Sequence, residues 1–122
     1  IEHKYGKIIN IASMTSFFGS ERIPAYTASK AGIAQLTKAL SNEWARSGVN
    51  VNAIAPGYMA TKLTKDIKEK NPKQYQEITS RIPAGRWGTG EDLKGLAVFL
   101  ASDASAYISG AVIPVDGGYL AK

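Results

Sequence analysis

The chain has 122 residues, 44% of them hydrophobic and 20% charged, which predicts a single folded domain over residues 1–122 and excludes a disordered or fibrous segment. It has no cysteine and one histidine, His3, which excludes disulfides and thiolate sites and leads us to expect no metal centre and no histidine-dependent triad. The net charge is +5, and the basic excess in the middle of the chain lies in the lysine-rich stretch 62–75 and at Arg81 and Arg86. Interleaved acidic residues there favour a solvated helix over a nucleic-acid-binding arm.

The first predicted elements are a strand and a long helix joined by a loop. Residues 7–12 are short and rich in isoleucine, as in a strand buried on both faces of a parallel sheet. Residues 13–23 lack periodicity and are predicted as a loop. A helix is predicted over residues 25–47, with Pro24 before it and Gly48 as its end. Apolar residues at offsets of three and four predict its buried face, formed by Ile33, Leu36, Leu40 and Trp44.

The second half of the chain returns to strands and shorter helices. Residues 49–56 are predicted as a strand, followed by two short helices over 61–70 and 72–80 and a loop over 81–90. A further helix is predicted to begin after Thr89, and residues 111–115 form a last short strand before a tail. The apolar stripe of this helix is predicted to consist of Leu93, Leu96, Ala97, Leu100 and Ala101. This alternation predicts an α/β fold with parallel strands and right-handed crossovers.

The sequence shows no targeting or membrane-spanning segment. The longest mostly apolar stretch, residues 95–101, is far shorter than the roughly 20 residues that cross a bilayer. No signal peptide is visible, so a cytoplasmic location is expected. The chain opens on Ile1, almost directly before the first strand, and we expect it to be cut from a longer protein.

A tyrosine and a lysine, Tyr26 and Lys30, are candidates for acid–base chemistry. On a helix, a spacing of four places both side chains on one face, where an ammonium group can stabilise a phenolate. Ser13 ends the first strand, and ligands bind at strand ends in open α/β sheets, so its hydroxyl is a candidate to bind the substrate oxygen. The alternative is a solvent-facing pair and a serine that caps a turn.

A second group of candidates follows the second strand. Pro56 and Gly57 predict a sharp turn that lets backbone amides approach a flat ligand. Thr61 lies four residues beyond Gly57 and either binds an amide group or caps the next helix. Turn and cap roles alone account equally well for these residues.

In combination, these motifs resemble the C-terminal half of the short-chain dehydrogenase/reductase family over essentially the whole chain. The resemblance rests on Ser13, the Tyr26-x-x-x-Lys30 pair, the spacing from Pro56 to Thr61, and the segments NVNAIAPG and PVDGG. It implies the C-terminal half of a Rossmann-like doubly wound parallel sheet and hydride transfer between NAD or NADP and an alcohol or ketone. The segments NEWA, APGYMAT, RIPAGRWG and VDGGYLA resemble the branch that acts on hydroxy- and keto-sugar acids such as 2-deoxy-D-gluconate.

The resemblance also implies roles for individual residues. Tyr26 would be the acid–base residue, Lys30 would stabilise its phenolate and hold the nicotinamide ribose, and Ser13 would orient the substrate oxygen. Residues expected at the cofactor are Tyr26, Lys30, Pro56, Gly57, Met59 and Thr61. Candidates to contact the substrate are Ser13, Tyr58 and Arg81, the arginine because it pairs with carboxylates. Trp87 is a further candidate for this role, but we expect it to pack a loop.

The resemblance further implies a pyrophosphate-binding part of the site that these residues do not supply. Full-length members begin with a strand and a Gly-x-x-x-Gly-x-Gly turn that holds the pyrophosphate. No glycines in this sequence have that spacing after a predicted strand. We therefore expect the isolated chain to bind NAD or NADP weakly and to be inactive. The open edge of the strand at residues 7–12 predicts a homo-oligomer. The alternative function is a non-catalytic module that docks on full-length relatives, with no membrane partner.

Overall fold

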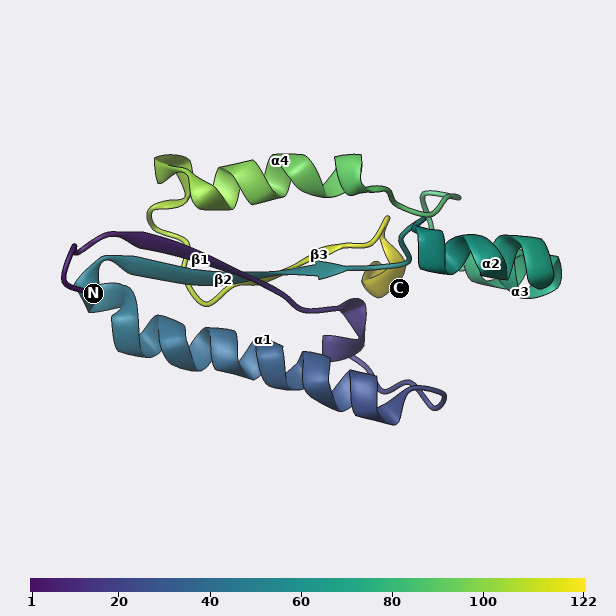
Figure 1. The fold of residues 1–122 in the computed structure, drawn as a ribbon, viewed down its shortest axis with the longest axis horizontal. Helices are drawn as coiled ribbons and strands as arrows, with labels where there is room; N and C mark the ends of the chain where they lie inside the picture. Colours follow the sequence, from purple (N-terminus) through teal and green to yellow (C-terminus); the bar gives the residue numbers. More distant parts are fainter.

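The computed structural model describes residues 1–122 as a three-stranded parallel sheet between two helices (Figure 1). The strands β1 (Gly6–Ile11), β2 (Val49–Pro56) and β3 (Val112–Val115) lie in the order β1-β2-β3. Gly6 pairs with Val49 at the start of the first ladder, and Ala53 pairs with Val112 at the start of the second. Helix α1 (Pro24–Trp44) covers one face of the sheet and α4 (Gly90–Ala101) the other. The predicted α/β class and parallel sheet are confirmed.

The two crossovers differ in hand. Both connections step across the sheet in the same direction, from β1 to β2 and from β2 to β3, yet their helices lie on opposite faces (Figure 1). These conditions force opposite hands, so the prediction of right-handed crossovers is wrong for one of them. The connection from β2 to β3 carries two additional helices, α2 (Lys62–Lys70) and α3 (Pro72–Ser80), so it is not the simple strand–helix–strand unit to which the rule applies.

The central strand forms the core of the sheet. In β2 the side chains of Val51, Ala53 and Ala55 are completely buried. Ala53 and Ala55 cluster with Ala12, just beyond β1, and Ile33 of α1 packs against this cluster. Because alanines occupy this surface, the helix axis can come close to the strands, which brings the first turn of α1 near the strand ends.

The face of α1 that meets the sheet is small and partly polar. Its buried residues are Ala34, Thr37 and Ser41. Asn10 of β1 donates a hydrogen bond from Nδ2 to Thr37 Oγ1 at 3.0 Å, and Ser41 Oγ donates to Ser109 Oγ at 2.7 Å. These bonds satisfy polar groups that would otherwise be costly to bury, and they fix the helix against the sheet.

The predicted buried stripe of α1 is therefore wrong at Leu36 and only partly buried at its other positions. Leu36 is 47% exposed, while Ile33, Leu40 and Trp44 are only partly buried. The small residues on the neighbouring face repeat with the same offsets of three and four, so helical periodicity fits both faces. Hydrophobicity selected the stripe beside the most buried one, so three of its four residues are partly buried and Leu36 is exposed.

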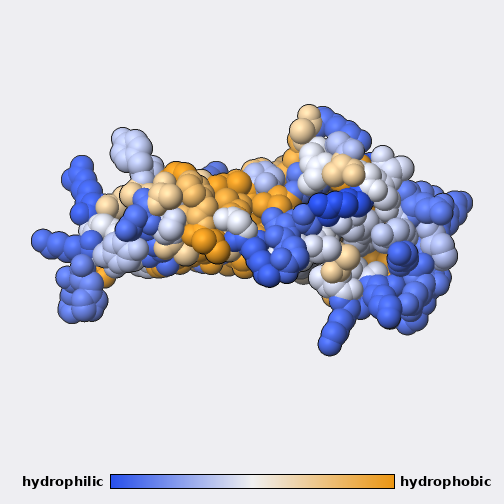
Figure 2. All heavy atoms as spheres, turned by 90° about the horizontal axis from the view of Figure 1, so that it is seen from above, coloured by the Kyte–Doolittle hydropathy of each residue, from blue (hydrophilic) through white to orange (hydrophobic).

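Helix α4 also buries less than predicted. Leu100 is buried, Leu93, Leu96 and Ala97 are partly buried, and Ala101 is exposed. Val98 and Phe99 are 69% and 37% exposed, and Figure 2 shows apolar side chains gathered on the face that α4 covers. None of the helices in the structure combines the length and apolar character needed to cross a bilayer.

The ends of α1 agree with the sequence prediction to within a turn. The helix ends at Trp44, and a 3-10 turn at Ala45–Ser47 carries the chain to Gly48. Gly48 has φ = 76°, and a Cβ there would collide with the carbonyl oxygen of Lys4. Glycine is therefore required at this stop for its conformation and for its lack of a side chain.

Helices α2 and α3 form a hairpin that projects beyond one end of the sheet (Figure 1). A second apolar cluster of Ile78, Ile82 and Trp87 joins the hairpin to the loop that follows it. Trp87 stacks on Tyr75 with 4.9 Å between ring centroids, and its Nε1 donates to Thr79 Oγ1 at 2.9 Å. The packing role expected for Trp87 is confirmed.

The charged residues of α2 pair within the helix. Lys65 lies 3.6 Å from Glu69, and Lys70 lies 2.8 Å from Asp66, both at a spacing of four. Such exposed pairs contribute little to stability but balance the local charge. They agree with the prediction of a solvated helix in this basic stretch.

Candidate active site

A cavity of about 310 Å³ opens at the carboxyl ends of β1 and β2. Its lining includes every residue predicted for catalysis or cofactor contact, namely Ser13, Tyr26, Lys30, Pro56, Gly57, Met59 and Thr61. Tyr58 lines the cavity as well, whereas Arg81 lies outside it. Residues from the β1 end, the first turns of α1 and the loop after β2 thus meet in one place.

Ser13 sits immediately beyond β1 and is 6% exposed. Its Oγ accepts a hydrogen bond from the backbone N–H of Thr15 at 3.2 Å, and its own N–H donates to Ser16 Oγ at 3.3 Å. The capping role is therefore real, but it uses Ser13 Oγ as an acceptor and leaves its proton free to donate. Ser16 Oγ in turn donates to the carbonyl of Lys30 at 2.7 Å, which ties this turn to α1.

Tyr26 and Lys30 lie on the first two turns of α1. Tyr26 is 46% exposed, and Lys30 Nζ lies 5.7 Å from the centroid of its ring. The same Nζ donates to the carbonyl oxygen of Ile11 at 2.9 Å, so the end of β1 holds the ammonium group in place. An ammonium group has three N–H donors, and two of them remain for a ligand.

Gly57 is required by a close contact inside the protein. A Cβ at this position would lie 2.7 Å from Cβ of Asp116, in the segment after β3. The N–H of Gly57 donates to the carbonyl of Val115 at 3.0 Å, which extends the pairing between the two strands. The sequence suggests that this glycine lets a ligand come close to the backbone. In the structure, it is Asp116 that comes close and leaves no room for a side chain.

Thr61 caps helix α2 and also lines the cavity. Its Oγ1 accepts from the N–H of Thr64 at 3.3 Å. Thr64 Oγ1 donates to the carbonyl of Met59 at 2.8 Å, and Met59 is bridged to Gly88 in the loop after α3. Both stems of the α2–α3 hairpin are thus joined beside the cavity, which fixes the backbone of Met59.

Arg81, a predicted substrate contact, lies in a neighbouring hollow of about 350 Å³. The two spaces share three lining residues, Phe18, Ser20 and Tyr58. Of the three substrate candidates, the structure therefore brings Ser13 and Tyr58 together and places Arg81 in the adjoining space.

Tyr58 forms the wall between the two spaces. Its ring packs against Trp87 and Tyr119, with centroid distances of 5.2 and 5.6 Å. Burial raises the pKa of Tyr58, and the neighbouring Tyr119 adds to the rise, while the positive charges of Arg81 and Arg22 oppose it. A phenol with a raised pKa stays protonated near neutral pH, so Tyr58 is suited to donate a hydrogen bond rather than to act as a base.

Several lining residues were missed by sequence reasoning. Thr15 and Thr64 line the main cavity, and Arg22 and Tyr119 line the neighbouring hollow. Thr64 could have been found, since a hydroxyl residue three positions after Thr61 matches a reciprocal helix cap. The others lie in a loop and a tail where no spacing rule applies.

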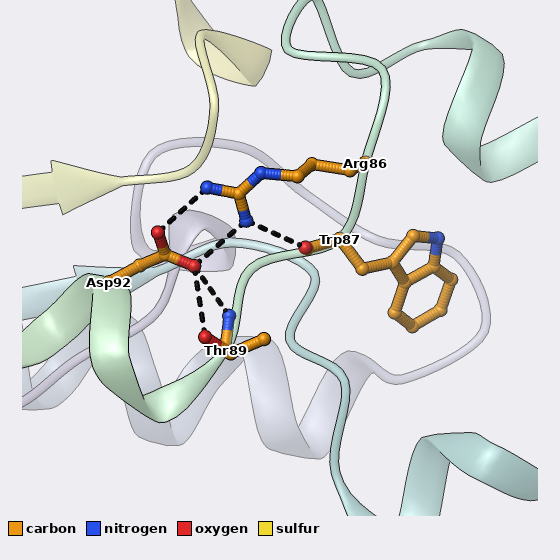
Figure 3. A network of polar contacts seen from close by, with 4 residues as sticks. All are labelled: Arg86, Trp87, Thr89 and Asp92. Atoms are coloured by element: carbon orange, nitrogen blue, oxygen red, sulfur yellow. Dashed lines mark hydrogen bonds and ion pairs between the residues drawn. The ribbon is translucent and has the colours of Figure 1, made fainter.

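A two-pronged ion pair fixes the loop that carries Gly88 (Figure 3). Arg86 donates from Nη2 to Asp92 Oδ1 at 2.8 Å and from Nη1 to Asp92 Oδ2 at 2.9 Å. Asp92 also accepts from the N–H of Thr89 at 2.7 Å, and Arg86 Nη1 donates to the carbonyl of Trp87 at 3.1 Å. These bonds hold the pKa of Asp92 far below its ordinary range, with Arg86 as the largest cause.

Comparison with known proteins identifies relatives along the whole chain. Residues 1–120 match the family described as enoyl-(acyl carrier protein) reductase. The 2-dehydro-3-deoxy-D-gluconate 5-dehydrogenase of Bacillus subtilis (strain 168) is 55% identical over 122 residues, which cover 100% of this chain and 48% of that protein.

Solved structures of sugar-acid dehydrogenases are also similar to this chain over nearly its whole length. A Beutenbergia cavernae protein, assigned as an NAD(P)-dependent gluconate 5-dehydrogenase and containing NADP, superimposes with a TM-score of 0.95 at 53% identity, covering 99% of this chain and 48% of its own. The gluconate 5-dehydrogenase of Burkholderia cenocepacia J2315, in complex with NADP and tartrate, gives 0.91 at 38% identity, covering 99% and 47%.

This chain spans about half the length of the curated relatives it matches and corresponds to their C-terminal half. The resemblance to sugar-acid dehydrogenases, predicted from four short segments, is confirmed by these relatives. The order of strands and helices and the cavity at the strand ends agree with this relationship, and the alignment covers the whole of this chain. The chain belongs to the short-chain dehydrogenase/reductase family.

Proposed function

We propose that this chain supplies the proton-transfer and substrate-contacting half of an oxidoreductase site that interconverts a hydroxyl and a carbonyl group on a sugar acid. The observation that carries the proposal is the presence of Ser13, Tyr26 and Lys30 in one cavity at the strand ends. The relatives support the substrate class, since one is named for 2-dehydro-3-deoxy-D-gluconate and others for gluconate.

Tyr26 is the proton-transfer group in this proposal. In the direction of reduction its phenol gives a proton to the substrate oxygen, and in oxidation its phenolate takes the proton from the substrate hydroxyl. Lys30, with Nζ 5.7 Å from the ring centroid, stabilises the negative charge on the phenolic oxygen during transfer. Ser13 donates its free hydroxyl proton to the same substrate oxygen and so orients the reacting carbon.

The cavity has the features that a nicotinamide needs. Half of its 16 lining residues are hydrophobic, which suits a flat ring, and Lys30 retains two N–H donors for ribose hydroxyls. The Met59 backbone and the Thr61 hydroxyl are available to a carboxamide. Bound there, the nicotinamide of NAD or NADP would supply or accept the hydride.

The remainder of a dinucleotide needs contacts that this cavity does not offer. We therefore propose that the isolated chain binds NADPH or NADH weakly and turns over little. A fluorescence titration of the purified chain with either nucleotide measures this directly. Binding in the micromolar range would contradict the expectation.

A hybrid enzyme tests the proposed chemistry. This chain would replace the corresponding half of the Bacillus subtilis relative, and turnover of 2-dehydro-3-deoxy-D-gluconate or D-gluconate would be followed by nicotinamide absorbance. We expect the Tyr26→Phe hybrid to lose at least about 100-fold in kcat, because the proton donor is removed. Tyr107→Phe removes the hydroxyl of a fully exposed tyrosine outside the cavity and serves as the control. Full activity in Tyr26→Phe would refute the assignment.

A non-catalytic docking module is the second candidate, favoured by the exposed Leu36 on α1 and the open outer edge of β1. In that case the chain would co-purify with a full-length relative through these surfaces. Changing Tyr26 to Phe would then alter neither the association nor the activity of the assembly. Loss of activity with unchanged association favours the catalytic proposal.

A further inference from the structure

The hollow that contains Arg81 has no role in the proton and hydride chemistry proposed above. The loop before α1 forms one wall and α3 the other, and the C-terminal turn completes it. Arg22 comes from the loop and Arg81 from the residue that ends α3, so two guanidinium groups come from separate walls. The hollow joins the catalytic cavity at Tyr58, which lines both.

Both arginines are available to an incoming anion. Arg22 has one ion-pair partner, Glu21, at 3.9 Å, and both side chains are at least three-quarters exposed, with 76% and 89% of their surface accessible. Such a pair is weak and easily exchanged. Arg81 makes no ion pair in the structure, and its backbone carbonyl accepts a hydrogen bond from Lys122 Nζ at 2.9 Å, which brings a third positive charge to this end of the hairpin.

Two carboxylates, Glu21 and Glu77, also line the hollow, so its formal charge is balanced. At Tyr58, where the hollow meets the catalytic cavity, the positive charges of Arg81 and Arg22 oppose the rise in the phenol pKa that burial causes. Both guanidinium groups are therefore close enough to this junction to act on a negatively charged group there.

We propose that this hollow binds the carboxylate of the sugar acid between Arg22 and Arg81, while the reacting carbon lies beside Tyr26 and Ser13. The proposal deepens the function proposed above and rests on it. In a sugar acid that reacts away from its acid end, several bonds separate the carboxylate from the reacting carbon, so the molecule must extend from one space into the next. A guanidinium group binds a carboxylate through two parallel hydrogen bonds, which gives direction as well as affinity.

Tyr58 lines both spaces where they join, and its phenol can act as a hydrogen-bond donor there. Its raised pKa keeps the phenol protonated near neutral pH, so it can donate to a hydroxyl or carboxylate oxygen that passes the junction. The arginine pair then selects acids over neutral sugars of the same length. Specificity for the acid therefore comes from Arg22 and Arg81, outside the cavity that holds the proton-transfer residues.

Protection from an arginine-specific reagent tests this site in the chain itself. The chain is treated with phenylglyoxal in the presence of D-gluconate or of D-glucitol, its neutral analogue, and each arginine is followed by mass spectrometry. We expect D-gluconate to slow modification of Arg22 and Arg81 while D-glucitol does not. Arg46, exposed in the turn after α1 and absent from both spaces, is the internal control. Equal effects of D-gluconate on all three arginines would overturn the proposal.

Binding measurements on variants give a second readout. Arg81→Gln and Arg22→Gln are each expected to raise the Kd for D-gluconate in an NMR titration by about tenfold, since each removes a charge-assisted contact. Arg46→Gln should leave it unchanged. Unaltered affinity in both hollow variants would exclude the site. If one variant fails to fold, protection in the unaltered chain still decides the question.

The two proposals fail in different ways. Protection of Arg22 and Arg81 that persists in Tyr26→Phe supports the carboxylate site independently of hydride transfer. In the opposite outcome, the hybrid enzyme turns over sugar acids in a Tyr26-dependent way while neither arginine is protected. That result would support the proposed function and overturn the carboxylate site.

Discussion

Asp92 is a single side chain on which a loop beside the site depends. It joins Arg86 to the first turn of α4 and accepts the N–H of Thr89. We expect Asp92→Asn to lower the melting temperature by several degrees, because the amide cannot replace the two-pronged ion pair or the charge at the helix start. Glu91→Gln, at the next position and in an exposed pair with Lys94, should have little effect.

The same carboxylate makes stability depend on pH. Because the folded state holds the pKa of Asp92 below its ordinary value of 3.8, the contribution is complete above that pH and is lost as the pH falls through the folded-state value. In thermal melts at decreasing pH, the unaltered chain should lose stability more steeply than Asp92→Asn. Parallel curves for the two proteins would contradict this assignment.

Single residues could be predicted from the sequence where a spacing constrains them. Tyr26 and Lys30 share a helix face whatever the tertiary structure, and Ser13 follows a recognisable strand. Arg22 and Tyr119 could not be predicted to line the hollow beside Tyr58, because a loop and a tail meet there through tertiary packing alone.

At the scale of elements, the positions of strands and helices were predictable because glycine and proline mark their ends. Pro24 begins α1, Gly48 stops the segment after it, and Pro72 separates α2 from α3. The face on which α1 packs was not predictable from hydrophobicity. Alanines in β2 favour a close helix, and a close helix selects small residues such as Ala34 over Leu36.

Two glycines, one inside α1 and one after the turn that follows it, should respond oppositely to alanine. Gly48→Ala is expected to destabilise the chain by about 2 kcal/mol or more, because φ = 76° disfavours a side chain and the Lys4 carbonyl occupies its place. Gly32→Ala, inside α1 with no neighbour near its Cβ position, should stabilise by about 0.5–1 kcal/mol. Chemical denaturation measures both, and equal effects would contradict the structural distinction.

The whole molecule exposes more surface than its size requires. A compact protein of 13.0 kDa is expected to expose roughly 6,300 Å², whereas this chain exposes 7802 Å². The uncovered regions include the outer edge of β1, where Ile11 is 51% exposed, and apolar side chains on both packed helices, such as Leu36 of α1 and Val98 of α4. The excess is comparable to the total area, roughly 1,600 Å², that two partners together bury in a stable interface of standard size.

We therefore expect the chain to self-associate, and Leu36 provides a test. Replacing this exposed leucine of α1 by serine should weaken association measured by multi-angle light scattering without lowering monomer stability. Leu63→Ser removes an even more exposed leucine, 86% accessible, from the projecting hairpin and is the matched control. A monomer at all working concentrations would refute the expectation.

The C-terminal turn returns to the site. Asp116 accepts the N–H groups of Gly118 and Leu120, and Lys122 binds the carbonyl of Arg81. A purification tag joined after Lys122 would therefore start at the end of α3, next to the hollow that Arg81 and Tyr119 line. Fusion at Ile1, at the opposite end of the sheet, keeps such an appendage away from both spaces (Figure 1).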